Sequence, residues 1–152
     1  MIEVRQLLEE DILEIWIIQK KSFQEDFKLN RDFSPAIETL ESFTERTKKY
    51  DVFTILYNKH IVGGMFVKEY NTSRIWKLSR IFIEPEFQSK GIGSFVINYI
   101  QEKYKDVDTW ILETPEKNKK GQIFYENNGF KNIGITKITE NLNTINYIKE
   151  NI

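Results

Sequence analysis

The stretch Phe82–Ile100, FIEPEFQSKGIGSFVINYI, constrains the fold most, because two kinds of periodicity meet in it across one turn. Before the turn, apolar residues alternate as they do in a strand. Pro85 ends that pattern, since proline has no N–H to give to a sheet. After the turn, apolar residues recur over Ile92–Ile100 at the spacing of an amphipathic helix. The sequence therefore predicts a strand, a glycine turn and a helix in immediate succession.

The turn has the features of an anion-binding site. A helix start leaves backbone N–H groups without partners, and the helix dipole adds partial positive charge there. Gly91 and Gly93 let a ligand approach the backbone closely, and Lys90 adds a cation. We therefore expect phosphate oxygens to bind along this segment, which consists of Gln88, Ser89, Lys90, Gly91, Ile92, Gly93 and Ser94.

Three phosphate-binding motifs compete for this segment. A Walker P-loop fails because its lysine follows the glycines, whereas Lys90 precedes them here. A dinucleotide fingerprint needs a third glycine where Val96 stands, so it fits less well but stays open. The pattern Gln/Arg-x-x-Gly-x-Gly/Ala is satisfied in full by Gln88–Gly93.

The remaining chain alternates between strand and helix patterns. DVFTILYNKHIVGGMFVKEY reads as a hairpin turning at Asn58–His60, and a helix is expected to begin with Ser34 as N-cap and Pro35 in its first turn. A further strand at Trp110–Thr114 follows the helix after the glycine turn. The strands on either side of that helix should be parallel, within a mixed α/β sheet that carries helices on both faces.

Composition and charge narrow the function classes. The 152 residues contain 22 basic and 23 acidic side chains, so no long-range field favours nucleic acid or a membrane. There is no cysteine, and the single histidine, His60, is expected to be a bystander in a turn, so no metal site is predicted. The N-terminus lacks a signal-peptide pattern and no segment is apolar enough to span a bilayer, which favours a cytoplasmic protein.

Two segments together resemble the GNAT-type N-acetyltransferases. LSRIFIEPEFQSKGIGSFVI is similar to their acetyl-CoA-binding motif, and ILETPEKNKKGQIFYENNGF to their second hallmark, in which a helix carries a tyrosine before Gly-Phe. The resemblance extends over the whole chain and implies a single N-acetyltransferase domain, 1–152. It also implies a mixed, mostly antiparallel sheet of about six to seven strands, with a V-shaped splay between the two central parallel strands.

The resemblance implies roles for individual residues. Acetyl-CoA would place its pyrophosphate on Gln88–Ser94, while its pantetheine arm would follow the backbone of Ile81, Phe82 and Ile83. Asn118 would be a further contact to the cofactor. Tyr125 would be the acid that protonates the departing thiolate, and Glu113 the base or a water-orienting carboxylate. Asn118 and Tyr125 are seven residues apart and so face one side of a helix. Glu113 lies at a strand's carboxyl end, where ligands of parallel sheets bind.

Structural explanations of the same residues remain open. Tyr125 could be a core tyrosine, Asn118 a helix cap and Glu113 a solvated residue at a strand rim. Pro115 also departs from the family's commoner continuation, which leaves the substrate subfamily undefined.

The expected reaction is acetyl transfer from acetyl-CoA to a primary amine by direct attack in a ternary complex. A CoA-binding sensor or docking module without turnover is the alternative. Acids and aromatics after the first helix suit a cationic acceptor, although a solvated acidic helix end explains the same residues; these are Phe23, Glu25, Asp26, Phe27, Asp32 and Phe33. Either a monomer or a homodimer fits the sequence.

Overall fold

The strands lie in the order β1-β2-β3-β4-β5-β7-β6 in the computed structural model, which describes residues 1–151. They are β1 (Ile2–Gln6), β2 (Asp51–Tyr57), β3 (His60–Tyr70), β4 (Thr72–Ile83), β5 (Thr109–Pro115), β6 (Lys131–Lys137) and β7 (Asn143–Glu150). The α-helices are α1 (Ile12–Ser22), α2 (Gln24–Leu29), α3 (Leu40–Thr47), α4 (Ile92–Lys103) and α5 (Lys119–Asn127). Short 3-10 turns are η1 (Glu9–Asp11), η2 (Ser34–Ala36) and η3 (Pro85–Phe87).

Strands β2, β3 and β4 form an antiparallel meander through two tight turns. Asn58 and Lys59 both have positive φ, 49° and 70°, which is the backbone that a two-residue hairpin needs. Asn71, with φ 67°, alone separates β3 from β4. The predicted hairpin is therefore confirmed.

Strands β4 and β5 are parallel and then diverge. Their register runs from Ile75↔Thr109 to Lys77↔Ile111 and stops there, while β4 continues to Ile83. On its other edge β4 also shifts register against β3, because Phe66 pairs with Arg80 but Val67 pairs with Leu78. Ser79 is the extra residue of this bulge, and bulges bend the strand that carries them. The predicted splay between two central parallel strands is confirmed.

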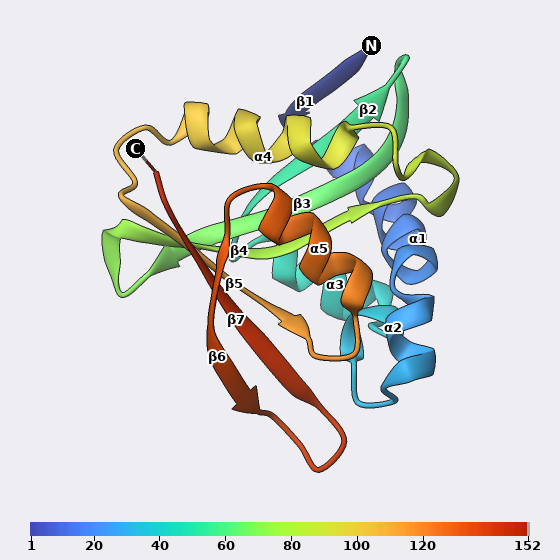
Figure 1. Cartoon of the computed structure of the whole chain (residues 1–152). Helices are drawn as coiled ribbons and strands as arrows, with labels where there is room; N and C mark the ends of the chain where they lie inside the picture. Colours follow the sequence, from blue (N-terminus) through green and yellow to red (C-terminus); the bar gives the residue numbers. More distant parts are fainter. Residues whose placement is uncertain (152) are drawn as a thin grey trace.

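Helices cover both faces of the sheet, as expected (Figure 1). On one face, Ile92 and Val96 of α4 are buried against the central strands together with partly buried aromatics of α5. On the other face, Ile15 and Ile18 of α1 form a second apolar cluster with Phe43 of α3. The sheet therefore holds α4 and α5 in fixed positions beside the diverging strands.

The helix expected to start at Ser34 and Pro35 begins later. These two residues open only the 3-10 turn η2, and α3 begins at Leu40 with Thr39 as its N-cap. The Oγ1 of Thr39 accepts a hydrogen bond from the Ser42 N–H at 3.1 Å. A second N-cap candidate close along the chain therefore sets the start of the helix that buries Phe43. Within residues 1–151, no helix combines the length and apolarity that crossing a membrane requires.

Candidate active site

The glycine turn presents backbone amides at the start of α4. Gly91 is the N-cap with φ 80°, and Ser89 also has a positive φ of 63°. The first amide bonded back into the turn is that of Phe95, which donates to the Gly91 carbonyl at 3.1 Å. The N–H groups of the three preceding residues, Ile92–Ser94, therefore point out of the first turn, where an anion can accept from them.

The two glycines of the turn are required for different reasons. Gly91 needs its left-handed backbone, and among residues 1–151 nothing lies within 4 Å of a Cβ added to it. A Cβ on Gly93 would lie 2.7 Å from Cζ of Phe124 in α5. Gly93 thus allows α4 and α5 to pack closely, while Gly91 shapes a surface that stays open.

Gln88 ties the turn to the end of β4. Its Nε2 donates to the Ile83 carbonyl at 2.9 Å, and its Oε1 accepts from Lys120 Nζ at 2.9 Å. The Ile83 carbonyl also accepts from Ser22 Oγ at 2.8 Å. Lys120 is thus an additional basic residue beside the predicted phosphate segment. The sequence offered only its place two residues after Asn118 as a signal, and an exposed lysine needs no special explanation.

Backbone direction distinguishes the three strand residues predicted to meet the pantetheine arm. The Glu84 N–H donates to Val62 of β3, and the Phe82 carbonyl lies against Gly63 of β3. Because backbone groups alternate in direction along a strand, those of Ile81 and Ile83 turn to the opposite edge, where β5 diverges. The geometry therefore favours the backbone of Ile81 and the N–H of Ile83, whose carbonyl already accepts from Gln88 and Ser22. The backbone of Phe82 belongs to the β3–β4 ladder.

Asn118 caps α5 and also faces the opposite helix layer. Its Oδ1 accepts from the Gly121 N–H at 2.8 Å, so the capping role left open by the sequence is present. Its Nδ2 lies 3.5 Å from Oδ2 of Asp26 in α2. The side chain therefore spans the space between α5 and α2.

Tyr125 is held by aromatic neighbours that leave its hydroxyl unused. Its ring centroid lies 5.9 Å from that of Phe130 and 6.0 Å from that of Tyr147. Within residues 1–151, Nε1 of Trp110 is the fully buried side-chain polar atom that lacks a hydrogen bond. The Tyr125 hydroxyl also has no protein partner, but it is not fully buried. Burial, and then the charge of Asp26, raise the pKa of Tyr125, so that the hydroxyl keeps its proton at neutral pH.

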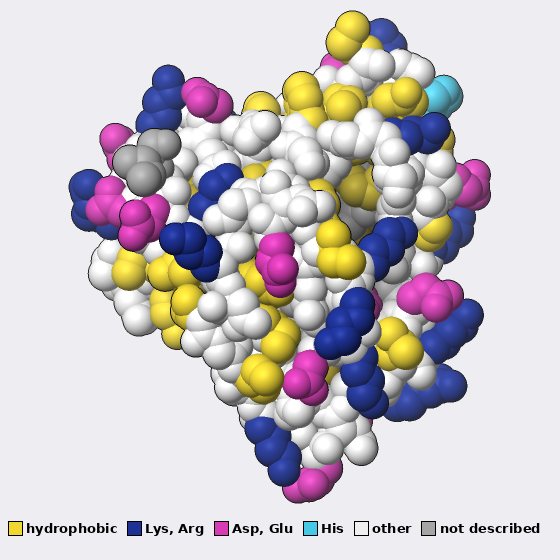
Figure 2. Space-filling view, in the orientation of Figure 1, with side chains coloured by type: hydrophobic (Ala, Val, Ile, Leu, Met, Phe, Trp, Pro, Cys, Tyr) yellow, Lys and Arg dark blue, Asp and Glu magenta, His cyan; other side chains and the backbone are white. Residues whose placement is uncertain are grey.

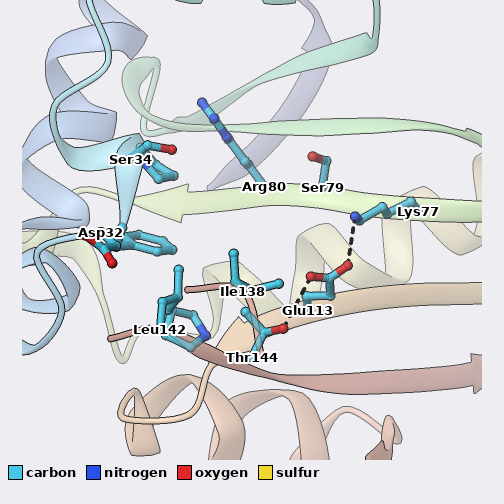
Figure 3. Close-up of a pocket in the computed structure, with 12 residues that line it drawn as sticks. Asp32, Ser34, Lys77, Ser79, Arg80, Glu113, Ile138, Leu142 and Thr144 are labelled. Carbon is cyan, nitrogen blue, oxygen red and sulfur yellow. Dashed lines mark hydrogen bonds and ion pairs between the residues drawn. The ribbon is translucent and has the colours of Figure 1, made fainter. Parts of the chain in front are cut away.

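Glu113 lies beyond the last β4–β5 pair, at the mouth of a cavity of about 340 Å³ (Figure 3). Its carboxylate is 3.1 Å from Lys77 Nζ and accepts from Thr144 Oγ1 at 3.4 Å. Figure 3 shows Glu113 between these two side chains, and its own side chain remains exposed at the strand rim. The structure thus makes Glu113 part of an ion pair in the cavity wall.

The cavity lies between the segment after α2, the strands β4 and β5, and the β6–β7 turn with the start of β7. Its lining is Asp32, Phe33, Ser34, Pro35, Lys77, Ser79, Arg80, Glu113, Pro115, Ile138, Leu142 and Thr144. The Asp32 carboxylate accepts a hydrogen bond from Thr139 Oγ1, which connects two of these walls. A second hollow is lined by Leu8, Glu9 and Glu10, which follow β1.

Of the acids and aromatics expected to shape an acceptor site, Asp32 and Phe33 line this cavity. Phe23 packs edge-on against Phe33, Phe27 lies under Arg31, and Glu25 is exposed. Asp26 is buried beside Asn118, a position that the sequence did not reveal. Since Lys77 and Arg80 also line the cavity, its charge is mixed rather than acidic.

Charge is mixed over the visible surface as well. Figure 2 shows basic and acidic side chains interspersed, with apolar side chains between them, on the face that carries α4 and α5. In the part of the chain that the structure describes, no group of three or more His, Cys, Asp or Glu side chains could hold a metal ion.

The chain belongs to the GNAT acetyltransferase family. The family model for the acetyltransferase (GNAT) domain matches residues 48–132, from the end of α3 to the start of β6. This range contains the glycine turn, the diverging strands and α5. The resemblance inferred from the two motifs is therefore confirmed.

Solved structures share the fold over almost the full chain. The structure of Ard1 from Thermoplasma volcanium matches with a TM-score of 0.82 at 14% identity, covering 98% of this chain and 97% of that one. The ribosomal-protein-S18-alanine N-acetyltransferase from Escherichia coli matches with a TM-score of 0.76 at 17% identity, covering 99% of this chain and 94% of that one. The PaiA N-acetyltransferase from Thermoplasma acidophilum, solved in complex with coenzyme A, matches with a TM-score of 0.71 at 17% identity, covering 96% of this chain and 98% of that one.

A curated relative is similar in sequence over a shorter range. The uncharacterized protein YrkN of Bacillus subtilis (strain 168) is 32% identical over 76 residues. That segment is 50% of this chain and 41% of YrkN, so the match spans less than half of the relative.

Proposed function

We propose that residues 1–152 form one N-acetyltransferase domain that transfers an acetyl group from acetyl-CoA to a primary amine by direct attack in a ternary complex. The observation that carries the proposal is the divergence of β4 from β5 between an amide-lined turn and an open tyrosine hydroxyl. Family membership supports acyl transfer as the reaction class. The neighbour solved with coenzyme A supports a CoA-type ligand.

The residues present fit acetyl-CoA, which would supply an activated thioester. The amides of Ile92–Ser94, with Lys90 and Lys120 nearby, would hold the pyrophosphate, and Gln88 and Ser89 would shape the turn. Backbone groups of Ile81 and Ile83 would order the pantetheine arm along the edge of β4. Asn118, already the cap of α5, would border that arm.

The proposed chemistry needs a proton donor for the departing sulfur. Tyr125 would supply it, because its hydroxyl stays protonated at neutral pH and is not bonded to another protein group within residues 1–151. Glu113 would orient the acceptor amine or a water, since its ion pair with Lys77 fixes it in the cavity wall. Asp32 and Glu113 supply negative charge for an ammonium acceptor, and Phe33, Ile138 and Leu142 supply apolar surface.

Thiol release from acetyl-CoA across a panel of amines tests the proposed function. We expect release above the rate without amine for at least one primary amine, and a corresponding N-acetyl product by mass spectrometry. Binding of acetyl-CoA without release for any amine would favour the alternative, a CoA-binding sensor or docking module. A panel in which only neutral or acidic amines react would contradict a cationic acceptor.

A further inference from the structure

Asp26 differs from the other buried acids of this protein because its carboxylate has almost no hydrogen bonds or ion pairs to offset its burial. Its side chain is 8% exposed, yet the described residues give its carboxylate one hydrogen bond, from Asn118 at 3.5 Å, and no ion pair. Asp11, by contrast, is bound by Arg5 at 2.6 Å and by the Leu8 N–H at 2.9 Å. A buried carboxylate is costly unless it is paired, so an uncompensated one calls for a functional explanation.

The position of Asp26 supplies that explanation. Its carboxylate is 3.5 Å from Asn118 Nδ2 in the cap of α5, and its charge acts on the Tyr125 hydroxyl; the sequence placed both residues on the ligand side of α5. Its Oδ1 has no protein partner within residues 1–151 and is not sealed off from solvent, as is also true of the Tyr125 hydroxyl. Two proton-carrying groups without a protein partner therefore lie near each other, one in α2 and one in α5.

We propose that Asp26 is the general base of this enzyme, accepting the proton that an alkylammonium acceptor must lose before its nitrogen attacks the thioester. This inference rests on the proposed function. It assigns to α2 the proton uptake that the sequence placed on Glu113, whose carboxylate is engaged by Lys77 and Thr144.

The proton balance of the reaction closes with these two residues. Asp26 takes one proton from R–NH₃⁺ and later releases it to solvent. The nitrogen then forms a C–N bond, the C–S bond breaks, and Tyr125 donates its proton to sulfur. The nitrogen's second proton, lost as the amide forms, restores the Tyr125 hydroxyl directly or through water. The products are an N-acetylamine, a thiol and one proton.

The surroundings of Asp26 suit a base that works near neutral pH. Burial, and then the charge of Glu25, raise the pKa of Asp26 to about 6. The groups that face it from the packed elements are Glu25 in α2 and Tyr125 in α5, and Lys117 donates to the Leu29 carbonyl at the end of α2. A carboxylate of this kind is mostly ionised at pH 7.5 and is a stronger base than an ordinary aspartate.

A chemical bypass tests the role in turnover. Asp26→Asn should lower kcat/KM about a hundredfold or more for the fastest alkylamine of the panel, because the acceptor enters as an ammonium ion. Methoxyamine is uncharged at neutral pH, so its rate should fall by less than about threefold, since its nitrogen needs no prior deprotonation. The matched control, Asp106→Asn, makes the same change at an exposed site before β5 and should leave both rates intact. Equal losses with both acceptors would overturn the proposal.

A second measurement is independent of turnover. Carbon-13 NMR of the aspartate carboxyls, with Asp26 assigned by comparison with Asp26→Asn, should show one group titrating near pH 6. An Asp26 that titrates in the ordinary aspartate range would overturn the proposal even if the enzyme is active. If no amine reacts, the proposed function fails instead, and the carboxyl titration still judges the environment claimed for Asp26.

Discussion

Two parts of the Tyr125 side chain have different roles: the ring packs in the core and the hydroxyl is available for chemistry. Its ring contacts Phe130 and Tyr147, whereas its hydroxyl has no protein partner within residues 1–151. Removal of the oxygen alone should therefore leave the fold and the ligand site unchanged. This makes the position suitable for testing the acid role that family resemblance implies.

Tyr125→Phe should lower kcat by about tenfold or more while the affinity for acetyl-CoA changes by less than about twofold, because only the transition-state proton donor is lost. Steady-state thiol release and calorimetric titration measure the two quantities. An unchanged kcat would remove Tyr125 from the acid role.

Single residues also show what the sequence could not reveal. Asn118 and Tyr125 were readable because their roles depend on helical spacing within one segment. The contact between Asp26 and Asn118 joins residues 92 positions apart, and that between Lys77 and Glu113 joins residues 36 apart. Such contacts depend on how elements pack, so the burial of Asp26 and the ion pair of Glu113 were not predictable from local pattern.

At the scale of elements, helices α4 and α5 meet through Gly93 and Phe124. A Cβ on Gly93 would lie 2.7 Å from the Phe124 ring, so one added methyl group forces either the Phe124 ring or the helices to shift. This contact fixes the glycine turn relative to Tyr125. From the sequence we expected Gly93 to be required for ligand approach, whereas the structure shows that helix packing requires it.

Gly93→Ala should therefore destabilise the protein by about 1–3 kcal/mol. In a Phe124→Ala background the same substitution should cost distinctly less, because the opposing ring is absent. Chemical unfolding of the four proteins in this cycle provides the measurement. Equal costs in both backgrounds would show that Gly93 is not required by the helix contact.

A buried charge network joins three other elements. Glu38 accepts from Arg80 of β4 at 2.6 Å, from Arg46 of α3 at 2.9 Å, and from Gln19 of α1 at 3.2 Å. Burial alone would raise the pKa of Glu38, but Arg80, then Arg46 and Gln19, outweigh it and lower the pKa to about 2. The network holds β4 against α1 and α3 next to the cavity that Arg80 lines.

This network predicts a pH dependence of stability. Because the folded-state pKa of Glu38 is depressed, its contribution is fully present above about pH 4.5 and is lost as the pH falls toward about 2. Glu38→Gln should cost roughly 3 kcal/mol at pH 7, since it leaves Arg80 without its counter-ion. The difference in unfolding free energy between wild type and Glu38→Gln should shrink from pH 5 to pH 3. A difference that stays constant over that range would refute the depressed pKa.

For the whole molecule, the order of strands and helices was readable because each element carries its own periodicity and the parallel pair must be separated by a helix. The start of α3 was predicted wrongly, because Ser34 and Thr39 both carry capping side chains and tertiary packing of Phe43 selects between them. The splay of β4 from β5 came from family resemblance. The bulge at Ser79, which bends β4 there, could not be predicted from the residues around it.

The central claim concerns the whole molecule, since the glycine turn, the strand edge and α5 must act as one site for acetyl-CoA. Calorimetric titration with acetyl-CoA, NAD and ATP tests it most directly, with Gly91→Glu and Gly134→Glu as a matched pair. Both glycines have positive φ, 80° and 138°, and among residues 1–151 nothing lies within 4 Å of a Cβ added to either.

We expect the protein to bind acetyl-CoA with micromolar affinity and to bind neither NAD nor ATP. Gly91→Glu should weaken acetyl-CoA binding by at least about tenfold, because a carboxylate would face the phosphates, and Gly134→Glu on β6 should leave it intact. Preference for NAD or ATP, or equal effects of the two substitutions, would contradict the assignment of the turn and the reaction that depends on it.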